Sequence, residues 1–143
     1  MNPAEMVAYI RSHADRVVAT VHASGAPQAA YLELTATDRG EIVFDAKTAS
    51  RKIANLRRDA RIAVVVGGAD GTTLQAEGVA DEPDGEERER CAAAFLGAFP
   101  HFAASLERDD VVLVRVALDW ARYGDFRPAT PIVREVEGFG ATG

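Results

Sequence analysis

The sequence predicts a single, mainly β domain (α+β) in which six or seven short antiparallel strands, with flanking helices, close into a small barrel. Three observations lead to this fold class. The length of 143 residues suits one domain. Short segments of strand-type alternation, separated by turn residues, outnumber the helical segments. So many strands favour a closed barrel over an open layer, and the edges of a small barrel are commonly covered by a second copy of the chain.

The first third of the chain predicts one helix and three strands. A helix over about residues 3–14 begins after Asn2, which can cap it, and Pro3 suits its first turn. Strand-type patterning then starts, and the sequences Ser-Gly-Ala-Pro and Asp-Arg-Gly supply the turns between strands. The predicted strands are Val17–Ser24, Gln28–Thr37 and Glu41–Ala46.

The rest of the chain predicts two further helices and three further strands. The apolar spacing of Ile53 and Leu56 indicates the first helix, and the run Ile62–Val66 is apolar on both faces, which is typical of a central, buried strand. Gly78 marks a bulge or a close approach within its strand. The helices are Arg51–Arg58 and Glu86–Phe99, and the other strands are Thr72–Asp81 and Val111–Leu118, the latter continuing through Trp120–Phe126. The barrel therefore spans about residues 16–126, and we expect an irregular tail over 127–143.

Composition excludes several classes of function. A net charge of −6 and a pI near 5.0 argue against nucleic acid or an anionic membrane as a partner. The chain shows neither a signal peptide nor a long apolar stretch, so we expect a cytoplasmic protein. The only cysteine, Cys91, excludes a cysteine zinc site, and the scattered histidines predict no metal site. The sequence Gly138–Gly143 spells G-x-G-x-x-G, but no helix follows it, so we set it aside as a nucleotide loop.

The sequence Ser50-Arg51-Lys52 at the start of a helix is the most informative segment for function. Two cations in a first helical turn oppose the helix dipole, which favours acidic residues there. A bound phosphate would make the two cations favourable instead of unfavourable, because free N–H groups, the Ser50 hydroxyl and the two cations could all bind it. The alternative is that Ser50 only caps the helix while Arg51 and Lys52 extend into solvent. No residue pattern indicates hydrolytic chemistry or a general acid or base, so the catalytic residues stay unassigned.

Four segments together resemble the pyridoxamine 5′-phosphate oxidase-like family over about residues 4–128. They read VVATVHASGAPQAA, EIVFDAKTASRKIANLRRDARIAVVV, LQAEGVA and VRVALDWARYGDF. The resemblance implies an FMN-binding split β-barrel of Greek-key-like topology that forms homodimers with flavin at the interface. It implies a flavin-dependent oxidoreductase with a small-molecule substrate and an electron donor such as NADH or NADPH.

The resemblance also implies positions for the cofactor. Ser50, Arg51 and Lys52 match the phosphate-binding SRK, and Asp45 and Ala46 fall where a strand lines the flavin ring. Thr73 and Gln75 lie in a strand that approaches the ring or the ribityl chain, with the register open. Trp120 and Tyr123, like Arg122 between them, fall in the last-strand region, although Trp120 could equally be a core or interface aromatic.

The sequence departs from the family pattern in two places, and these departures count against the family's activity more than against its cofactor. Ala30 and Thr35 stand where the oxidases have an arginine and a lysine for the FMN phosphate. The tail lacks the Arg-x-His segment that grips the substrate's phosphate, so pyridoxamine 5′-phosphate is not the expected substrate. Three alternatives stay open: a flavin-binding protein without turnover, a deazaflavin enzyme, and a haem protein with His22 or His101 as the only conceivable axial ligands.

Overall fold

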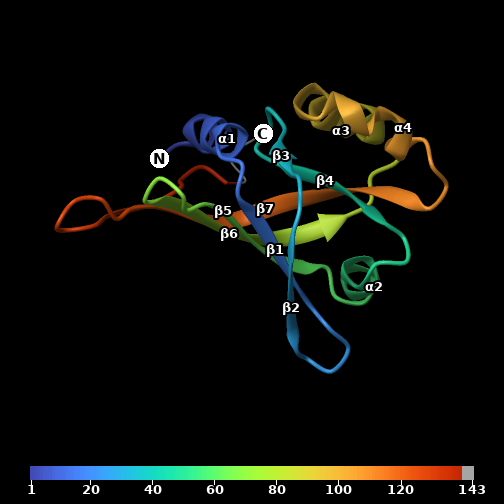
Figure 1. The fold of residues 1–143 in the computed structure, drawn as a ribbon, viewed down its shortest axis with the longest axis horizontal. Coiled ribbons are helices and arrows are strands. Elements are labelled where there is room, and N and C mark those ends of the chain that lie inside the picture. The colour runs from blue at the N-terminus through green and yellow to red at the C-terminus, as the bar shows by residue number, and fades with distance from the viewer. Residues whose placement is uncertain (140–143) are drawn as a thin grey trace.

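The computed structural model describes residues 1–139 and contains one curled antiparallel sheet with helices packed around it (Figure 1). Seven strands follow the order β2-β1-β5-β6-β7-β4-β3, and β8 pairs with β7. The strands are β1 (Arg16–Val21), β2 (Pro27–Tyr31), β3 (Thr35–Ala36), β4 (Ile42–Lys47), β5 (Arg61–Gly67), β6 (Thr72–Asp81), β7 (Val111–Asp125) and β8 (Ile132–Glu135). The helices are α1 (Pro3–Ser12), α2 (Arg51–Arg58), α3 (Gly85–Ala98), the 3-10 turn η1 (Pro100–Phe102) and α4 (Ala103–Leu106).

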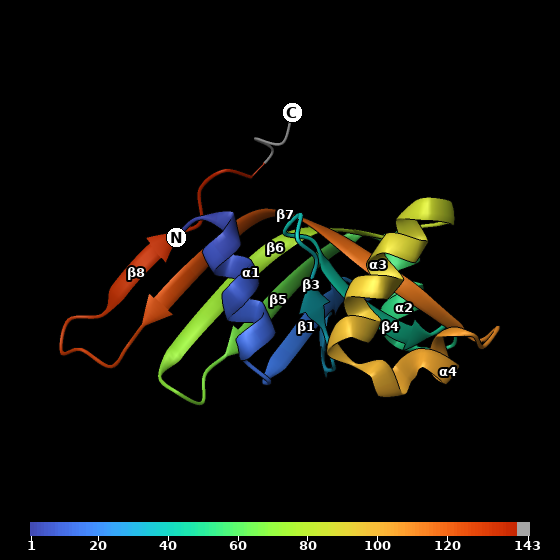
Figure 2. The same cartoon turned by 90° about the horizontal axis from the view of Figure 1, so that it is seen from above.

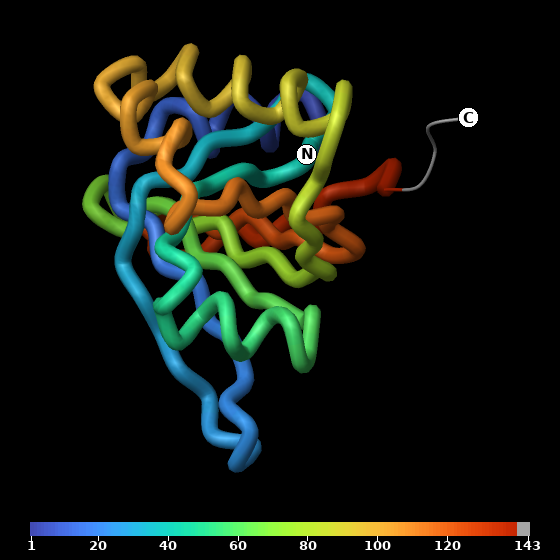
Figure 3. Tube along the Cα trace, turned by 90° about the vertical axis from the view of Figure 1, so that its right-hand side faces the viewer, coloured from blue at the N-terminus to red at the C-terminus, as the bar shows by residue number. Residues whose placement is uncertain are grey.

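The helices cover different parts of the sheet. In Figure 2, α1 crosses over β5, β6 and β7, while α3 and α4 lie over the region of β4. Figure 3 shows α3 and α4 on one side of the strands and α2 on the other, with the β1–β2 hairpin extending beyond α2. The helix α2 contacts β1. Its N-terminus follows shortly after β4, and Arg51 and Lys52 share a pocket with residues of β1 and β2.

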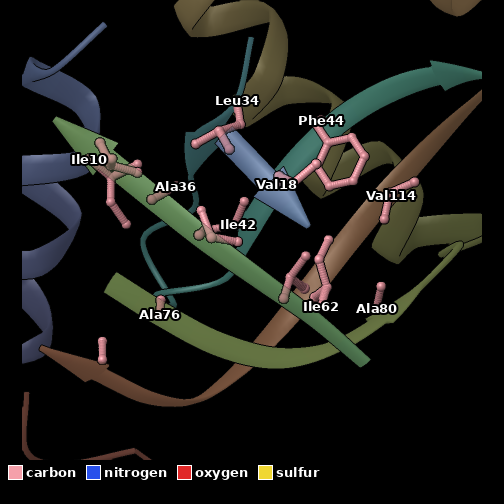
Figure 4. Close-up of a cluster of buried hydrophobic side chains, with 14 of the residues drawn as sticks. Ile10, Val18, Leu34, Ala36, Ile42, Phe44, Ile62, Ala76, Ala80 and Val114 are labelled. Carbon is pink, nitrogen blue, oxygen red and sulfur yellow. The ribbon is translucent and has the colours of Figure 1, made fainter. Parts of the chain in front are cut away.

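The main core lies inside the curl of the sheet, because alternate residues of the central strands β1, β5 and β6 are buried there. Val18, Phe44 and Val114 come from three strands, and Leu34 of the β2–β3 connection and Ile10 of α1 join them (Figure 4). The helix α2 contributes residues to the same cluster. A second cluster under α3 is built around Cys91, Phe95 and Phe99 and packs on the other face of β4 and β7.

The strands β6 and β7 come unusually close at a break in their register. The register shifts between Glu77 and Gly78, as expected of a β-bulge. A Cβ atom on Gly78 would lie 2.3 Å from the carbonyl oxygen of Ala117. The predicted bulge or close approach at Gly78 is confirmed, and its cause is that only hydrogen fits between the two backbones.

Four predictions about elements need correction. The segment Gln28–Thr37 forms two strands, β2 and the two-residue β3, because residues 32–34 leave the ladder. The tail predicted to be irregular forms β8, whose four residues are all exposed and therefore carry no burial pattern in the sequence. The run Ile62–Val66 is central as predicted but buried on one face only, since Val65 is 42% exposed. The N-terminal helix ends at Ser12 rather than near residue 14.

No helix among residues 1–139 is both long enough and apolar enough to cross a membrane. The glycine-rich sequence Gly138–Gly143 falls mostly outside the described residues, which end at Phe139.

Candidate functional site

The N-terminus of α2 is the first part of the candidate site. Ile53 and Leu56 lie three residues apart and are buried in the main core, which fixes the helix on the sheet. The first turn contains no acidic residue, whereas Arg57 and Arg58 lie in the last turn, where the helix dipole favours cations. The sequence thus places cations at both ends of the helix, and only those at the C-terminal end agree with the dipole.

Ser50 does not do what a capping serine normally does. It occupies the N-cap position, with φ −72° and ψ 152°, but its hydroxyl makes no capping hydrogen bond within the described chain. The Oγ atom is buried and has no partner among residues 1–139. A buried hydroxyl without a partner loses its water hydrogen bonds and gains nothing in return. The capping hydrogen bond that the alternative expects of Ser50 is therefore absent from the described chain, whereas Arg51 is exposed, as that alternative expects.

A pocket of about 260 Å³ opens beside Arg51 and Lys52. Its other walls come from β1 and β2 and are formed by Val18, Thr20, Gln28, Ala29 and Ala30. In the described part of the chain neither Arg51 nor Lys52 takes part in a salt bridge, although most other arginines do. Two cations that form no salt bridge within the described residues, at a helix N-terminus, suit an anion with several oxygen atoms.

Asp45 and Ala46 lie at the end of β4 that precedes α2, and as neighbours in a strand they point to opposite faces of the sheet. Both residues border a second cavity, of about 640 Å³, with Phe102 and Ser105, and Ala46 also belongs to the main core. Burial raises the pKa of Asp45, while its backbone hydrogen bond, the Ser105 hydroxyl and the charge of Lys52 act in the opposite direction and are weaker. The electrostatic influence of Lys52 on Asp45 links the second cavity to the N-terminal turn of α2.

The remaining predicted site residues lie on the far strands of the sheet. Thr73 and Gln75 are on the outer face of β6, where Gln75 accepts a hydrogen bond of 3.3 Å from Arg122 of β7. The guanidinium of Arg122 lies 5.6 Å from the ring centre of Trp120, and the indole N–H donates to Glu135 at 3.2 Å. These side chains form one group, which we call the outer-face group: Thr73, Gln75, Trp120 and Arg122.

Tyr123 does not belong to this group. It pairs with Leu74, one residue out of phase with Gln75, and so points to the inner face of the sheet. There its ring packs edge-on against Tyr9 of α1, with ring centres 5.6 Å apart, and it borders the main core.

Within one chain Arg51 and Lys52 line one pocket directly after Ser50, whereas Asp45 borders a different cavity and the outer-face group lies elsewhere. Three polar residues of the pocket region were missed by sequence reasoning: Thr20 and Gln28 in the pocket wall and Asn55 behind it. Asn55 alone carried a usable signal, since it is polar at a position between Ile53 and Leu56 where the helix faces the core. Thr20 and Gln28 lie in strands and gave no comparable signal.

No histidine lines the pocket beside Arg51 and Lys52. His22 is exposed in the β1–β2 turn, where its Nδ1 accepts a hydrogen bond from the backbone N–H of Ser24. His101 is exposed in η1, and its ring lies 4.4 Å from that of Phe102, centre to centre. Among residues 1–139 no group of three or more His, Cys, Asp or Glu side chains is placed to hold a metal ion.

Comparisons with known proteins bear on the family and the fold of the chain. Residues 3–124 match the sequence profile of the family described as pyridoxamine 5′-phosphate oxidase. No curated protein sequence is significantly similar to the chain.

Several solved structures share the fold. A heme binding protein from Mycobacterium smegmatis is similar with a TM-score of 0.78 and 20% identity, over 94% of this chain and 58% of that protein. This chain therefore spans little more than half of its length. A conserved hypothetical protein from Mycobacterium tuberculosis has a TM-score of 0.74 and 24% identity over 92% of both chains. HutZ, the heme storage protein from Vibrio cholerae, has a TM-score of 0.68 and 19% identity, over 83% of this chain and 92% of that one. With the observed sheet, these similarities confirm the predicted fold class, an antiparallel split barrel with flanking helices.

Proposed function

Because the chain belongs to the pyridoxamine 5′-phosphate oxidase family, we propose that it binds FMN and acts as a flavin-dependent oxidoreductase. The FMN phosphate lies at the N-terminus of α2, held by Ser50, Arg51 and Lys52. The observation that carries this proposal is the buried Ser50 Oγ without a partner, next to two cations that form no salt bridge in the described chain. A phosphate supplies acceptor oxygens for all three side chains.

The electrostatics of α2 favour an occupied site. Each cation in the first turn of an exposed helix costs about 0.3–1 kcal/mol against the dipole. A phosphate makes the same charges favourable, since each charge-assisted hydrogen bond contributes about 1.5–3 kcal/mol. The anion therefore turns an unfavourable arrangement of Arg51 and Lys52 into a favourable one.

Bound FMN supplies the transfer of hydride or electrons between a donor and a small substrate. The chain's own residues bind and orient it: Ser50, Arg51 and Lys52 at the phosphate, and Asp45 and Ala46 along the strand beside the ring. No side chain is assigned as a general acid or base. Pyridoxamine 5′-phosphate is not the proposed substrate, because the tail lacks the Arg-x-His segment that binds its phosphate.

We also propose that a second copy covers the outer face of β1, β5 and β6. Three valines are exposed there, namely Val17 (36%), Val65 (42%) and Val79 (49%). A shallow pocket of about 370 Å³ lies on the same face, with Ala19 and Ala63 among its walls. Exposed apolar surface of this kind is typical of an interface, and a two-fold axis would bring the same face of both copies together. The outer-face group would then lie next to the partner copy.

The test of the cofactor site is a spectrum followed by a titration. The purified protein, alone and after addition of FMN, is expected to show the flavin absorbance bands after removal of free ligand. The double variant Arg51→Ala/Lys52→Ala should lose FMN retention. The matched control is Arg57→Ala/Arg58→Ala, which removes two cations from the other end of the same helix, where Arg57 pairs with Glu82 and Arg58 bonds the carbonyl of Val21. Unchanged FMN affinity in the first variant would refute the assignment.

Turnover separates an oxidoreductase from a flavin-binding protein without activity. Stopped-flow mixing of the FMN-loaded protein with NADH or NADPH, followed by reoxidation with oxygen, measures it. Reduction by either nucleotide supports the enzyme, and failure with both favours the binding protein.

Haem binding is a second candidate, since two of the structural neighbours are described as heme-binding and heme storage proteins. The residues of this chain fit it less well. The Ser24 N–H donates to Nδ1 of His22, which places the ring proton of the neutral imidazole on Nε2, the nitrogen that an iron would need. A sharp Soret band after addition of hemin, lost in His22→Ala or His101→Ala, would favour haem. Titration with a deazaflavin coenzyme, in parallel with FMN, tests whether that coenzyme occupies the same phosphate pocket.

A further inference from the structure

Asn55 is a buried polar residue on the face of α2 that packs against the sheet. It is only 1% exposed and lies between the core residues Ile53 and Leu56. Its side-chain nitrogen Nδ2 donates two hydrogen bonds, one to Oγ1 of Thr20 and one to Oε1 of Gln28, each 2.9 Å long. Both hydrogens of the amide are thereby committed.

These two bonds decide what Thr20 and Gln28 present to the pocket. Thr20 of β1 and Gln28 of β2 are direct cross-strand partners, so their side chains lie side by side on one face. Asn55 occupies an acceptor site on each of them. The hydroxyl hydrogen of Thr20 and the two amide hydrogens of Gln28 are left for another acceptor. Asn55 thus orients both side chains as donors.

The pocket that receives these donors is the one beside Arg51 and Lys52. Ala30 lines the same pocket, and it stands where the family resemblance places a cation for the phosphate. The strand wall of the pocket therefore offers neutral donors in place of that charge. A phosphate carries acceptor oxygens only, which makes it complementary to a wall of donors.

We propose that Thr20 and Gln28 bind the phosphate of the ligand through a donor wall, and that Asn55 is the positioning residue that sets their polarity. This inference rests on the proposed FMN site and deepens it. It assigns the discrimination between phosphorylated and unphosphorylated flavin to these two neutral side chains as well as to the two cations. FMN is therefore bound much more tightly than riboflavin, which has the same ring and ribityl chain.

A merely structural role for Asn55, tying α2 to the β1–β2 hairpin, predicts a different result. Loosening the hairpin would weaken FMN and riboflavin by similar factors, because it disturbs the whole pocket. Loss of phosphate donors weakens FMN alone. The ratio of the two dissociation constants separates these roles.

The experiment measures the Kd of FMN and of riboflavin by quenching of flavin fluorescence in the full chain. Gln28→Met and Thr20→Val remove the donors with little change in shape and none in charge. Each is expected to raise the Kd of FMN about tenfold or more, as for the loss of a hydrogen bond to a charged group, with the Kd of riboflavin changed less than about twofold.

Asn55→Asp replaces the amide with a carboxylate of the same shape, which reverses the direction of the hydrogen bonds to Thr20 and Gln28. An aspartate at this position accepts hydrogen bonds, which turns the Thr20 hydroxyl and the Gln28 amide inward and away from the pocket. It should weaken FMN more than either single donor variant. Asn2→Asp is its matched control, since it makes the same change at the cap of α1, where aspartate caps as well as asparagine.

Each outcome decides a separate point. A selective loss of FMN affinity in Gln28→Met and Thr20→Val supports the donor wall. Wild-type affinity in both variants, or equal losses for FMN and riboflavin, overturns it while leaving the Arg51–Lys52 site intact. Where Asn55→Asp does not fold, the two neutral variants decide. A wild-type chain that binds neither flavin refutes the proposed function itself, and the inference with it.

Discussion

Adding one methyl group at Gly78 tests how closely β6 and β7 approach. A Cβ atom there would lie 2.3 Å from the carbonyl oxygen of Ala117 and 3.0 Å from its carbonyl carbon. The nearest atoms belong to backbone, so no side chain can rotate away. In Gly78→Ala the two strands must separate by roughly an ångström to reach an ordinary contact distance.

The expected cost follows from where this separation occurs. The strands β6 and β7 pair along most of their length, and the residues flanking Gly78 belong to that ladder. Overpacking of a tight site costs about 1–3 kcal/mol, and we expect the upper end because backbone must move. For a domain of this size that lowers the Tm by roughly 10 °C. Urea denaturation followed by circular dichroism measures the free energy of unfolding directly.

Gly97→Ala is the matched control, because it adds the same atom at an open position. Gly97 lies inside α3 and has nothing within 4 Å of the added Cβ. An alanine there should stabilise the protein by about 0.5–1 kcal/mol through its helix propensity. If Gly78→Ala is as stable as wild type while Gly97→Ala behaves as expected, the close approach of β6 and β7 is not what requires a glycine.

Two further predictions concern titratable groups. Hydrogen bonds from Thr72 and His13 hold the pKa of Asp70 well below its usual range. The stability that these hydrogen bonds give the folded protein is therefore fully present above the ordinary carboxyl pKa of about 3.9, and it is lost progressively as the pH falls below that value. The difference in unfolding free energy between wild type and Asp70→Ala should shrink from pH 7 to pH 3, and a constant difference would contradict it. Burial raises the pKa of the Cys91 thiol, so it should react with a chromogenic disulfide far more slowly in the native protein than in urea; equal rates would show that α3 does not cover it.

The elements with a strong period could be predicted from sequence, and those without one could not. The strand Thr72–Asp81 and the helix Arg51–Arg58 have the predicted bounds, because alternation and apolar spacing record which face is buried. The strand β8 was missed because all four of its residues are exposed, so only backbone pairing with β7 defines it. The break between β2 and β3 was missed because Leu32, Glu33 and Leu34 keep the strand-type alternation after leaving the ladder.

The candidate site was predicted only where charge contradicts local structure. Arg51 and Lys52 stand out because a helix start disfavours cations, and this conflict is visible in the sequence. Thr20 and Gln28 stand out only after folding, because β1 and β2 must pair before their side chains meet. Asn55 is an intermediate case. A polar residue at a core-facing position of a helix predicts from sequence that it makes a buried hydrogen bond, but only the fold shows that the partners are Thr20 and Gln28.

The apolar run in β5 bears on whether the proposed site needs a second copy of the chain. Its pattern indicates burial on both faces, yet Ala63 and Val65 are exposed on the outer one. Gln75 lies on the same face of the neighbouring strand, directly opposite Val65. The outer-face group and the α2 pocket are therefore on different sides of one copy, so they can act on one ligand only if the outer face of one copy meets another. A proposal that assigns both groups to FMN thus requires the homodimer. A protein that stays monomeric at micromolar concentration while binding FMN would remove Gln75 and Trp120 from the site and leave the α2 pocket as all of it.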